Sequence, residues 1–198
     1  MSYQSKILGT GRYLPPTILT NDEISKRVDT NHQWIVERTG IHERRIGKVE
    51  DGDFTSSMAA KSSKIALEAA GLQPNDIDFI MMTTTMGDMQ MPNTASFLQV
   101  ALGITNGCAC IDVNAACTGF TYGFVMADAL IRTGAYKTIL VIGSDMTSGF
   151  NNWDDRGVCI LFGDGSGAAV LGRAPEGDQS RLLAQILGGD GTKAEHLI

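Results

Sequence analysis

The sequence predicts an α/β fold in which helices cover a largely parallel sheet. Short apolar runs alternate with segments of helical periodicity along the middle of the chain, a rhythm typical of β-α-β units. The chain has 23 glycines among 198 residues, and they fall between these runs, where short turns would join strands and helices. Hydrophobic residues make up 43% and charged residues 19%, which supports a packed core and excludes an intrinsically disordered chain.

The N-terminal part is predicted to hold one strand and three helices. The apolar run over residues 6–14 is typical of a strand, and two prolines end it. Asn21 is expected to cap a short helix with acidic residues in its first turn. A second short helix is predicted over 31–38. A longer one is predicted over 56–70, where apolar residues recur at helical spacing and Gly71 follows as a C-terminal cap.

A regular alternation of strands and helices follows. Helices are predicted over 94–102, before Gly103, and over 117–133, before Gly134. The predicted strands cover 77–83, 108–113 and 138–142. Because strands alternate with helices, we expect neighbouring strands to run parallel.

The C-terminal part departs from this alternation. Apolar runs at 157–162 and 166–171 flank Gly163-Asp164-Gly165, a pattern that predicts a β-hairpin. Residues 180–187 would make one more strand. The glycine-rich run lacks the spacing and the lysine of a phosphate-binding loop, so we interpret it as a tight turn.

The charge balance and the cysteine pattern exclude several classes of protein. With 16 basic and 22 acidic residues the net charge is -6, whereas nucleic-acid binders are usually basic. No apolar run is long enough for a membrane span, and the N-terminus lacks the pattern of a secretory signal. The four cysteines form no C-x-x-C pair and the three histidines are scattered, so no metal site is expected. We therefore expect a cytoplasmic protein of small-molecule metabolism with reduced thiols.

Cys117 is the main candidate for a reactive residue. It lies where a predicted strand passes into a long helix, and the helix dipole and free backbone N–H groups at such a junction stabilise a thiolate. The small neighbours Ala115, Ala116 and Gly119 leave room for a substrate carbonyl and for an oxyanion hole of backbone N–H groups. Free cysteines also commonly just pack in cores, so from spacing alone both interpretations stay open. The other cysteines, 108, 110 and 159, fall within predicted strands and are weaker candidates.

Basic and aromatic residues suggest a nucleotide site. Trp34 stands near four basic residues, Arg38, Arg44, Arg45 and Lys48. An indole can stack on a base while guanidinium groups bind phosphates, although a solvated helix face is the commoner explanation of such a pattern. Trp153 and Arg156 form another indole–arginine pair within a polar loop. Of five methionines between 81 and 91, we expect Met81 and Met82 to fill the core, while the others could line an acyl pocket.

Four segments of the chain carry a further signal when they are taken together and in order. They are Trp34-Ile35-Val36-Glu37-Arg38-Thr39-Gly40-Ile41, Ala115-Ala116-Cys117-Thr118-Gly119-Phe120, Asp155-Arg156-Gly157 and Phe162-Gly163-Asp164-Gly165-Ser166-Gly167-Ala168. The same order occurs in β-ketoacyl-acyl-carrier-protein synthase III, and the chain resembles this family of the thiolase superfamily from Lys6 to about Gly191. The resemblance implies a thiolase-like fold, here mainly the N-terminal β/α half of a five-layered αβαβα sandwich. Residues 1–175 would form the nucleophile-bearing domain, and 176–198 would begin the connection to a C-terminal half.

The resemblance also implies a reaction and its site. Cys117 would take an acetyl or other short acyl group from acyl-CoA, and the acyl group would condense with malonyl-acyl-carrier protein, with loss of carbon dioxide, to start fatty-acid synthesis. Trp34 and Arg156 match residues that sandwich the CoA adenine, and Arg38 and Thr30 match others near the nucleotide. The substrate-pocket positions are Met91 and Phe162. No cofactor would be bound permanently, because acyl-CoA is a substrate, and the enzyme would be a homodimer.

The family's C-terminal half supplies a histidine and an asparagine, and neither can be assigned here. His32 and His42 belong to the nucleotide-side segment, and His196 precedes the expected position. The chain would then be a fragment, or its other half a separate chain. Two alternatives stay open: a non-catalytic truncated paralogue that binds CoA or a partner chain, and a related condensing enzyme of the 3-hydroxy-3-methylglutaryl-CoA synthase, alkylquinolone or polyketide type.

Overall fold

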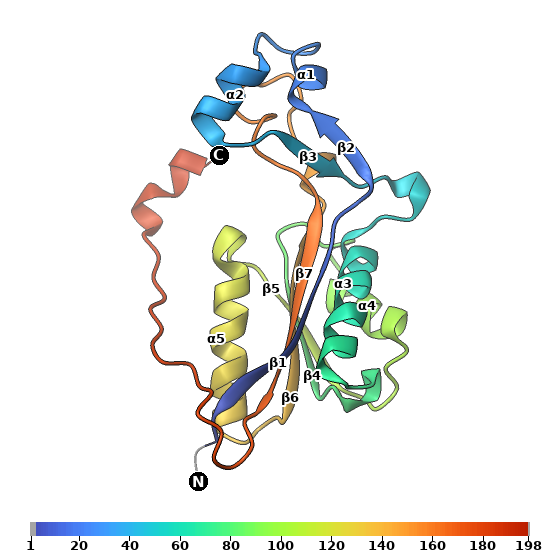
Figure 1. Ribbon diagram of the computed structural model, residues 1–198, viewed down its shortest axis with the longest axis vertical. Coiled ribbons are helices and arrows are strands. Elements are labelled where there is room, and N and C mark those ends of the chain that lie inside the picture. Colours follow the sequence, from blue (N-terminus) through green and yellow to red (C-terminus); the bar gives the residue numbers. More distant parts are fainter. Residues whose placement is uncertain (1–2, 198) are drawn as a thin grey trace.

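A five-stranded sheet with helices on both faces forms the body of the protein, and a small lobe extends from one end of it (Figure 1). The computed structural model describes residues 3–197, and it describes side chains as far as residue 195. Along the sheet the strand order is β1-β7-β6-β4-β5. The strands are β1 (Ser5–Tyr13), β4 (Phe79–Thr83), β5 (Ala109–Val113), β6 (Thr138–Asp145) and β7 (Gly165–Arg173), and the helices that cover them are α3 (Thr55–Ala70), α4 (Thr94–Leu102) and α5 (Gly119–Arg132).

The small lobe is built from two short strands, two short helices and a long loop. Its regular elements are β2 (Thr17–Thr20), α1 (Asn21–Ile24), α2 (His32–Thr39) and β3 (Glu43–Ile46). β2 pairs antiparallel with β3. Residues from the loop between β6 and β7 complete the lobe, because Cys159 and Ile160 pack with Ile24 and Ile35 in its apolar core. The lobe therefore joins segments far apart in the sequence.

The sheet is mixed rather than largely parallel. β4 runs parallel to β5 and to β6, as predicted, but β7 runs antiparallel to both β6 and β1. Only a short 3₁₀ turn over Thr147–Gly149 and a loop connect β6 to β7, without a crossover α-helix, so the chain reverses direction between them and the antiparallel pairing follows.

The hairpin predicted around Gly163-Asp164-Gly165 is wrong. Residues 157–161 form turns rather than a strand, and β7 pairs with β1 and β6. The apolar side chains of this run, Cys159 and Ile160, are buried in the small lobe, which explains their character without a strand. Asp164 accepts hydrogen bonds from the backbone N–H groups of Gly47 (2.7 Å) and Ser148 (2.8 Å), and these bonds fix the turn.

Helix boundaries follow the predicted signals with two corrections. Thr20, not Asn21, caps α1, because its hydroxyl accepts from the backbone of Glu23 while the Glu23 carboxylate accepts from the backbone of Thr20. Asn21 lies inside the first turn and is fully buried. α5 begins at Gly119, two residues later than predicted, after a 3₁₀ turn over Ala116–Thr118.

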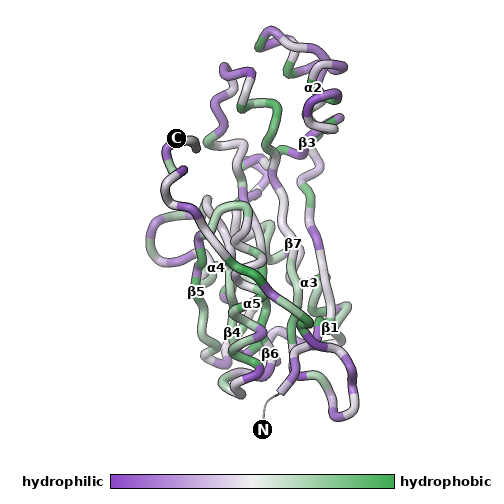
Figure 2. Tube along the Cα trace, turned by 90° about the vertical axis from the view of Figure 1, so that its left-hand side faces the viewer, coloured by the Kyte–Doolittle hydropathy of each residue, from purple (hydrophilic) through white to green (hydrophobic). Residues whose placement is uncertain are grey.

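The core lies on both faces of the central strands, where Figure 2 shows apolar residues along β4, β6 and α5. α3 and α4 cover one face, and α5 covers the other (Figure 1). Met82 packs on the α3 side and Met81 on the α5 side, both fully buried. The prediction that these two methionines fill the core is confirmed.

The C-terminal tail beyond β7 contains no strand within the described residues, so the strand predicted over 180–187 is wrong. Leu183 is 82% exposed and Ile186 95% exposed, and no sheet edge pairs with them. The tail runs beside α5, where the Tyr122 hydroxyl donates to the carbonyl of Gly188 (3.2 Å), and ends in a 3₁₀ turn over Gly191–Leu197 (Figure 1). Among residues 3–197, none of the helices is long and apolar enough to cross a membrane.

Candidate functional site

Cys117 lies at the end of the sheet that faces the small lobe, in the turn between β5 and α5. Its side chain is exposed. Two short-range hydrogen bonds shape the turn: Asn114 Oδ1 accepts from the backbone of Ala116 (3.2 Å), and the carbonyl of Ala115 accepts from the Thr118 hydroxyl (2.7 Å). Ala116 has φ 45°, a left-handed conformation that non-glycine residues adopt at a cost. The chain thus holds Cys117 outward on a tight strand-to-helix turn.

Two glycines let the first turns of α5 approach β4 closely. A Cβ at Gly123 would lie 2.7 Å from the Thr83 methyl group, and one at Gly119 would lie 3.4 Å from the Thr83 Cβ. The Thr83 hydroxyl donates to the carbonyl of Ile142 (2.8 Å), which fixes the side chain between the strands. This close approach places the turn that carries Cys117 over the carboxyl end of β4. Sequence analysis did not identify Thr83 or Gly123 as part of this support.

Asp145, at the carboxyl end of β6, anchors the loop that follows β4. Its Oδ1 accepts hydrogen bonds from the Thr84 hydroxyl (2.8 Å), from both the backbone and the hydroxyl of Thr85 (2.8 and 3.0 Å), and from the backbone of Met86 (3.0 Å). Met91 lies further along this loop and is 83% exposed. Sequence analysis missed Asp145, although its place directly after a buried apolar strand was a usable signal.

The small lobe brings three predicted nucleotide-site residues together. The Arg38 guanidinium lies 4.2 Å from the Trp34 ring centroid, and that of Arg156 lies 4.9 Å from it. Arg156 also donates to the carbonyl of Asp29 (3.1 Å). The neighbouring Thr30 hydroxyl is buried and has no hydrogen-bond partner within the described part of the chain. Trp34, Arg38 and Arg156 thus form one cation–aromatic stack, with Thr30 one residue from the carbonyl that Arg156 binds.

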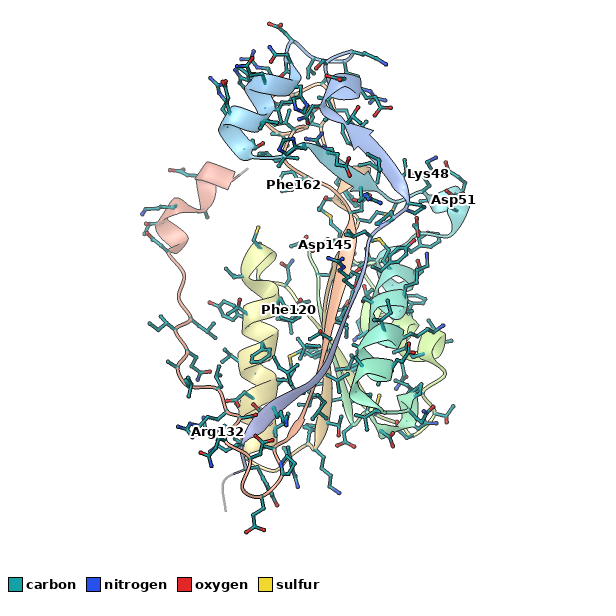
Figure 3. The ribbon with its side chains drawn as sticks, viewed as in Figure 1. Lys48, Asp51, Phe120, Arg132, Asp145 and Phe162 are labelled. Atoms are coloured by element: carbon teal, nitrogen blue, oxygen red, sulfur yellow. The ribbon has the colours of Figure 1, made fainter. Side chains whose placement is uncertain are left out.

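Other pairings expected from spacing do not form. Trp153 does not pair with Arg156; its indole N–H donates to the carbonyl of Ser148 (3.2 Å), and Arg27 lies 5.7 Å from its ring. The basic cluster around Trp34 also does not form as predicted. Arg44 is buried, and Arg45 donates to the carbonyl of Pro15. Lys48 lies beside Asp51, where the small lobe joins the sheet (Figure 3).

Cys117 is the one exposed thiol among the four cysteines, all of which are unpaired. Cys108 and Cys159 are buried, and burial raises the pKa of both thiols. Cys159 lies in a turn rather than within the predicted strand. Cys108 precedes β5, and Cys110 lies half-buried on that strand. This ranking agrees with the choice of Cys117 as the candidate nucleophile.

Phe162, the second predicted pocket residue, is 41% exposed and lies between the small lobe and the Phe120 end of α5 (Figure 3). Met91 lies on the loop after β4 and is largely exposed to solvent.

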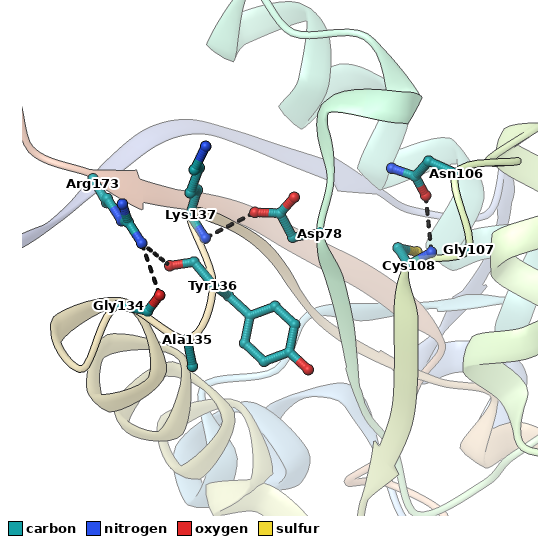
Figure 4. A pocket seen from close by; sticks show the side chains of 9 residues that line it. All are labelled: Asp78, Asn106, Gly107, Cys108, Gly134, Ala135, Tyr136, Lys137 and Arg173. Carbon is teal, nitrogen blue, oxygen red and sulfur yellow. Dashed lines mark hydrogen bonds between the residues drawn. The ribbon is translucent and has the colours of Figure 1, made fainter.

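A separate pocket of about 390 Å³ lies at the opposite end of the sheet (Figure 4). Its charged groups bind backbone atoms: Asp78 accepts from the backbone of Lys137 (2.8 Å), and Arg173 donates to the carbonyl of Gly134 (3.0 Å). None of the predicted site residues lines it. Within the part of the chain that the structure describes, no group of three His, Cys, Asp or Glu side chains could hold a metal ion.

Comparisons with known proteins agree with the fold and with the resemblance. The family model of 3-oxoacyl-[acyl-carrier-protein] synthase III matches residues 111–191. The β-ketoacyl-[acyl-carrier-protein] synthase III of Thiobacillus denitrificans is 47% identical over 197 residues, which make up 100% of this chain and 60% of that protein. The chain thus spans about 60% of the length of the curated relatives it matches.

Two solved structures extend the comparison to the fold. The 3-oxoacyl-[acyl-carrier-protein] synthase III of Aquifex aeolicus has a TM-score of 0.83 at 42% identity, covering 87% of this chain and 55% of that one. The priming β-ketosynthase of the R1128 polyketide biosynthetic pathway has a TM-score of 0.83 at 32% identity, covering 87% and 51%. These similarities confirm the predicted thiolase-like α/β fold. Over its whole length, the chain corresponds to the N-terminal part of the β-ketoacyl-[acyl-carrier-protein] synthase III family.

Proposed function

We propose that this chain carries the nucleophile of a condensing enzyme that starts fatty-acid synthesis. The Cys117 thiolate attacks the carbonyl of acetyl-CoA or another short acyl-CoA, the thioester bond to CoA breaks, and CoA leaves as a thiolate that takes up a proton. Malonyl-acyl-carrier protein then loses carbon dioxide, its carbanion forms a bond to the acyl carbon, and the Cys117 thiolate is released. The observation that carries this proposal is the single exposed thiol on a fixed strand-to-helix turn.

The small lobe is the proposed site for the CoA nucleotide. The Trp34 ring and the Arg156 guanidinium offer two planar surfaces for the adenine, and Arg38 offers a fixed cation for the phosphates. Thr30 follows Asp29, whose carbonyl accepts from Arg156, so Thr30 would lie beside the bound nucleotide. No resident cofactor is required, because acyl-CoA is consumed. Phe162, and Met91 through a partner subunit, would contact the acyl chain.

An uncovered apolar face on the α5 side of the sheet supports a C-terminal partner half. A cavity of about 420 Å³ lies between α5 and strands β1 and β7, lined by Ile7, Phe120 and Phe124 among others. Ile7 is 48% exposed, and Phe120 is 38% exposed. Because α5 alone covers this face, a further layer would bury it, and residues 176–198 would begin the connection to that layer after the domain formed by 1–175.

A homodimer through the free edge of β5 completes the proposal. Among the described strands, β5 pairs with β4 alone, so no strand covers its outer edge. Ile111 on this strand is 40% exposed. Antiparallel pairing of two copies would cover the edge. Such an enzyme would work in the cytoplasm, where acyl-CoA is found, and the histidine and asparagine for decarboxylation would come from the C-terminal half.

The test is acyl transfer to Cys117. The full gene product is incubated with acetyl-CoA and its intact mass recorded; an acetyl adduct is expected on the unchanged protein and on Cys110→Ser, and none on Cys117→Ser. No adduct on the full product, or an undiminished one on Cys117→Ser, refutes the assignment. CoA binding by calorimetry without any adduct would instead support a non-catalytic paralogue. Turnover with a primer other than acetyl-CoA would favour the polyketide type, to which the 32% identical priming synthase belongs.

A further inference from the structure

We propose that Arg44 is a positioning residue for the nucleotide site. It fixes helix α2, which carries Trp34, relative to the loop that carries Arg156. This inference rests on the proposed function. Arg44 lies on β3 with 5% of its surface exposed, so it cannot itself reach a bound nucleotide from solvent. It acts through the segments that it joins.

Arg44 is a buried cation with neutral partners. Its Nη1 donates to Asn21 Oδ1 (2.8 Å) and to the carbonyl of Leu19 (3.4 Å), and its Nη2 donates to the carbonyl of Ile160 (2.8 Å). None of the described carboxylates forms an ion pair with it, and its Nε has no hydrogen-bond partner among the residues that the structure describes. Burial lowers the pKa of this guanidinium, which reflects the cost of keeping the charge there. A buried charge without a counter-ion is poorly explained by stability alone.

The partners of Arg44 belong to the two sides of the stack. On one side, Asn21 Nδ2 donates to the carbonyl of Ile41 (2.8 Å), which lies two residues beyond the end of α2, the helix of Trp34. On the other side, Ile160 lies in the same turn as Arg156, and that turn is closed by the backbone N–H of Cys159 donating to the carbonyl of Asp155 (2.9 Å). The Arg44 fork therefore links α2 to the loop that carries Arg156.

The planar fork of arginine is what this link requires. Its two terminal nitrogens donate in different directions, toward Asn21 and toward Ile160, at 2.8 Å each. A lysine in the same place would keep the charge, but its single nitrogen could not serve both acceptors from one position. Loss of the fork would let the Arg156 loop move relative to Trp34. Displacements near 1 Å at a binding site are enough to cost up to about 100-fold in rate.

The experiment compares acetyl-CoA with acetyl-pantetheine, which lacks the adenine nucleotide. In the full gene product, Arg44→Met and Arg44→Lys are expected to raise the KM of Cys117 acylation by acetyl-CoA about tenfold or more. Acylation by acetyl-pantetheine, and alkylation of Cys117 by iodoacetamide, should change less than about twofold, because neither uses the nucleotide site. Arg45→Met is the matched control, since this neighbouring arginine contacts the carbonyl of Pro15 instead.

A second variant tests the same link while keeping Arg44, so that the proposal can still be tested if the Arg44 variants misfold. Asn21→Asp keeps an acceptor for Arg44 and supplies a counter-charge, but it removes the donor to the carbonyl of Ile41. It should therefore show the same selective rise in KM for acetyl-CoA. Equal effects on acetyl-CoA and acetyl-pantetheine, or no effect on either, would overturn the positioning role. Failure of the unchanged protein to accept an acetyl group from either donor would instead overturn the proposed function, which distinguishes the two failures.

Discussion

The closest backbone contact between sheet and helix lies where β1 crosses α3, and a methyl group added there should be strongly destabilising. A Cβ placed on Gly11 would lie 2.2 Å from the carbonyl oxygen of Ser62 and 2.6 Å from the backbone nitrogen of Ala66. Real Cβ atoms essentially never approach other atoms within 3.0 Å. The substitution Gly11→Ala therefore needs a relative movement of nearly 1 Å between strand and helix, because both obstacles are backbone atoms.

The cost of that movement follows from what holds the two elements. Ser62 and Ala66 are fully buried, so α3 can shift only by opening its contact with the sheet. β1 can shift only by disturbing its pairing with β7, in which Gly11 faces Ala168. Overpacking of this kind typically costs 1–3 kcal/mol, and we expect about 3 kcal/mol here because no side chain can rotate away. For a chain of this size, that corresponds to a fall in Tm of about 6–12 °C.

Thermal and urea unfolding, followed by circular dichroism, measure this effect, and Gly167→Ala is the matched control. Gly167 also lies in a paired strand, opposite Arg12, but a Cβ there would have no atom within 4 Å. Gly167→Ala should leave the Tm unchanged or raise it slightly, because alanine has less conformational entropy in the unfolded chain. Equal Tm values for the two variants would refute the argument that the β1–α3 contact leaves no room for a side chain.

Three further predictions concern the loops and turns near the site. Asp145→Ala should lower the free energy of unfolding by about 2–3 kcal/mol in urea titrations, since four hydrogen bonds to one carboxylate oxygen are lost; Asp145→Asn, which keeps an acceptor, should cost less. Burial works to raise the pKa of Asp53, but hydrogen bonds from Lys61 and from the backbone of Lys48 outweigh it and hold the pKa below 3.8. A carboxylate whose pKa is lower in the folded than in the unfolded state stabilises the fold at pH values above the unfolded pKa, and this stabilisation is lost as the pH falls. Asp53→Asn should therefore reduce the urea midpoint near pH 7 and much less near pH 2. Ala116→Gly relieves a left-handed conformation that costs alanine about 1 kcal/mol but adds a similar amount of entropy to the unfolded chain, so its Tm should change little; a Tm lowered by several degrees would show that the turn is not strained.

The regular part of the fold could be predicted because its signals are local. The helices α3 and α4 show their buried faces as apolar periodicity, and both end at glycines with positive φ, Gly71 and Gly103. The strand predicted over 157–162 was wrong for the opposite reason. Its apolar side chains pack against α1 and α2, more than a hundred residues earlier in the chain, and local spacing carries no information about such a partner.

The candidate site likewise contains features that local sequence predicts and features that it does not. The position of Cys117 at a strand-to-helix junction could be predicted from pattern, and so could its small neighbours. The stacking of Arg156 on Trp34 could not, because proximity in sequence pairs Arg156 with Trp153, and only the resemblance to a family indicated otherwise. The hydrogen-bonding roles of Asp145 and Asp164 were missed, because an acidic residue in a sequence cannot be told from a surface charge until its hydrogen-bond partners are known.

The placement of the acidic residues also resolves an apparent conflict between a net charge of -6 and the polyanionic substrate that we propose. Asp145 and Asp164 accept hydrogen bonds from backbone N–H groups of loops, and Asp112 accepts them from the first turn of α4, so part of the negative charge serves to fix these segments. Arg38 and Arg156, by contrast, lie together on one ring in the small lobe. Since charges in physiological salt are screened beyond about 8 Å, a phosphate at the lobe would respond to these arginines rather than to the sum over the chain. Local arrangement, not net charge, therefore decides which anions this surface can bind.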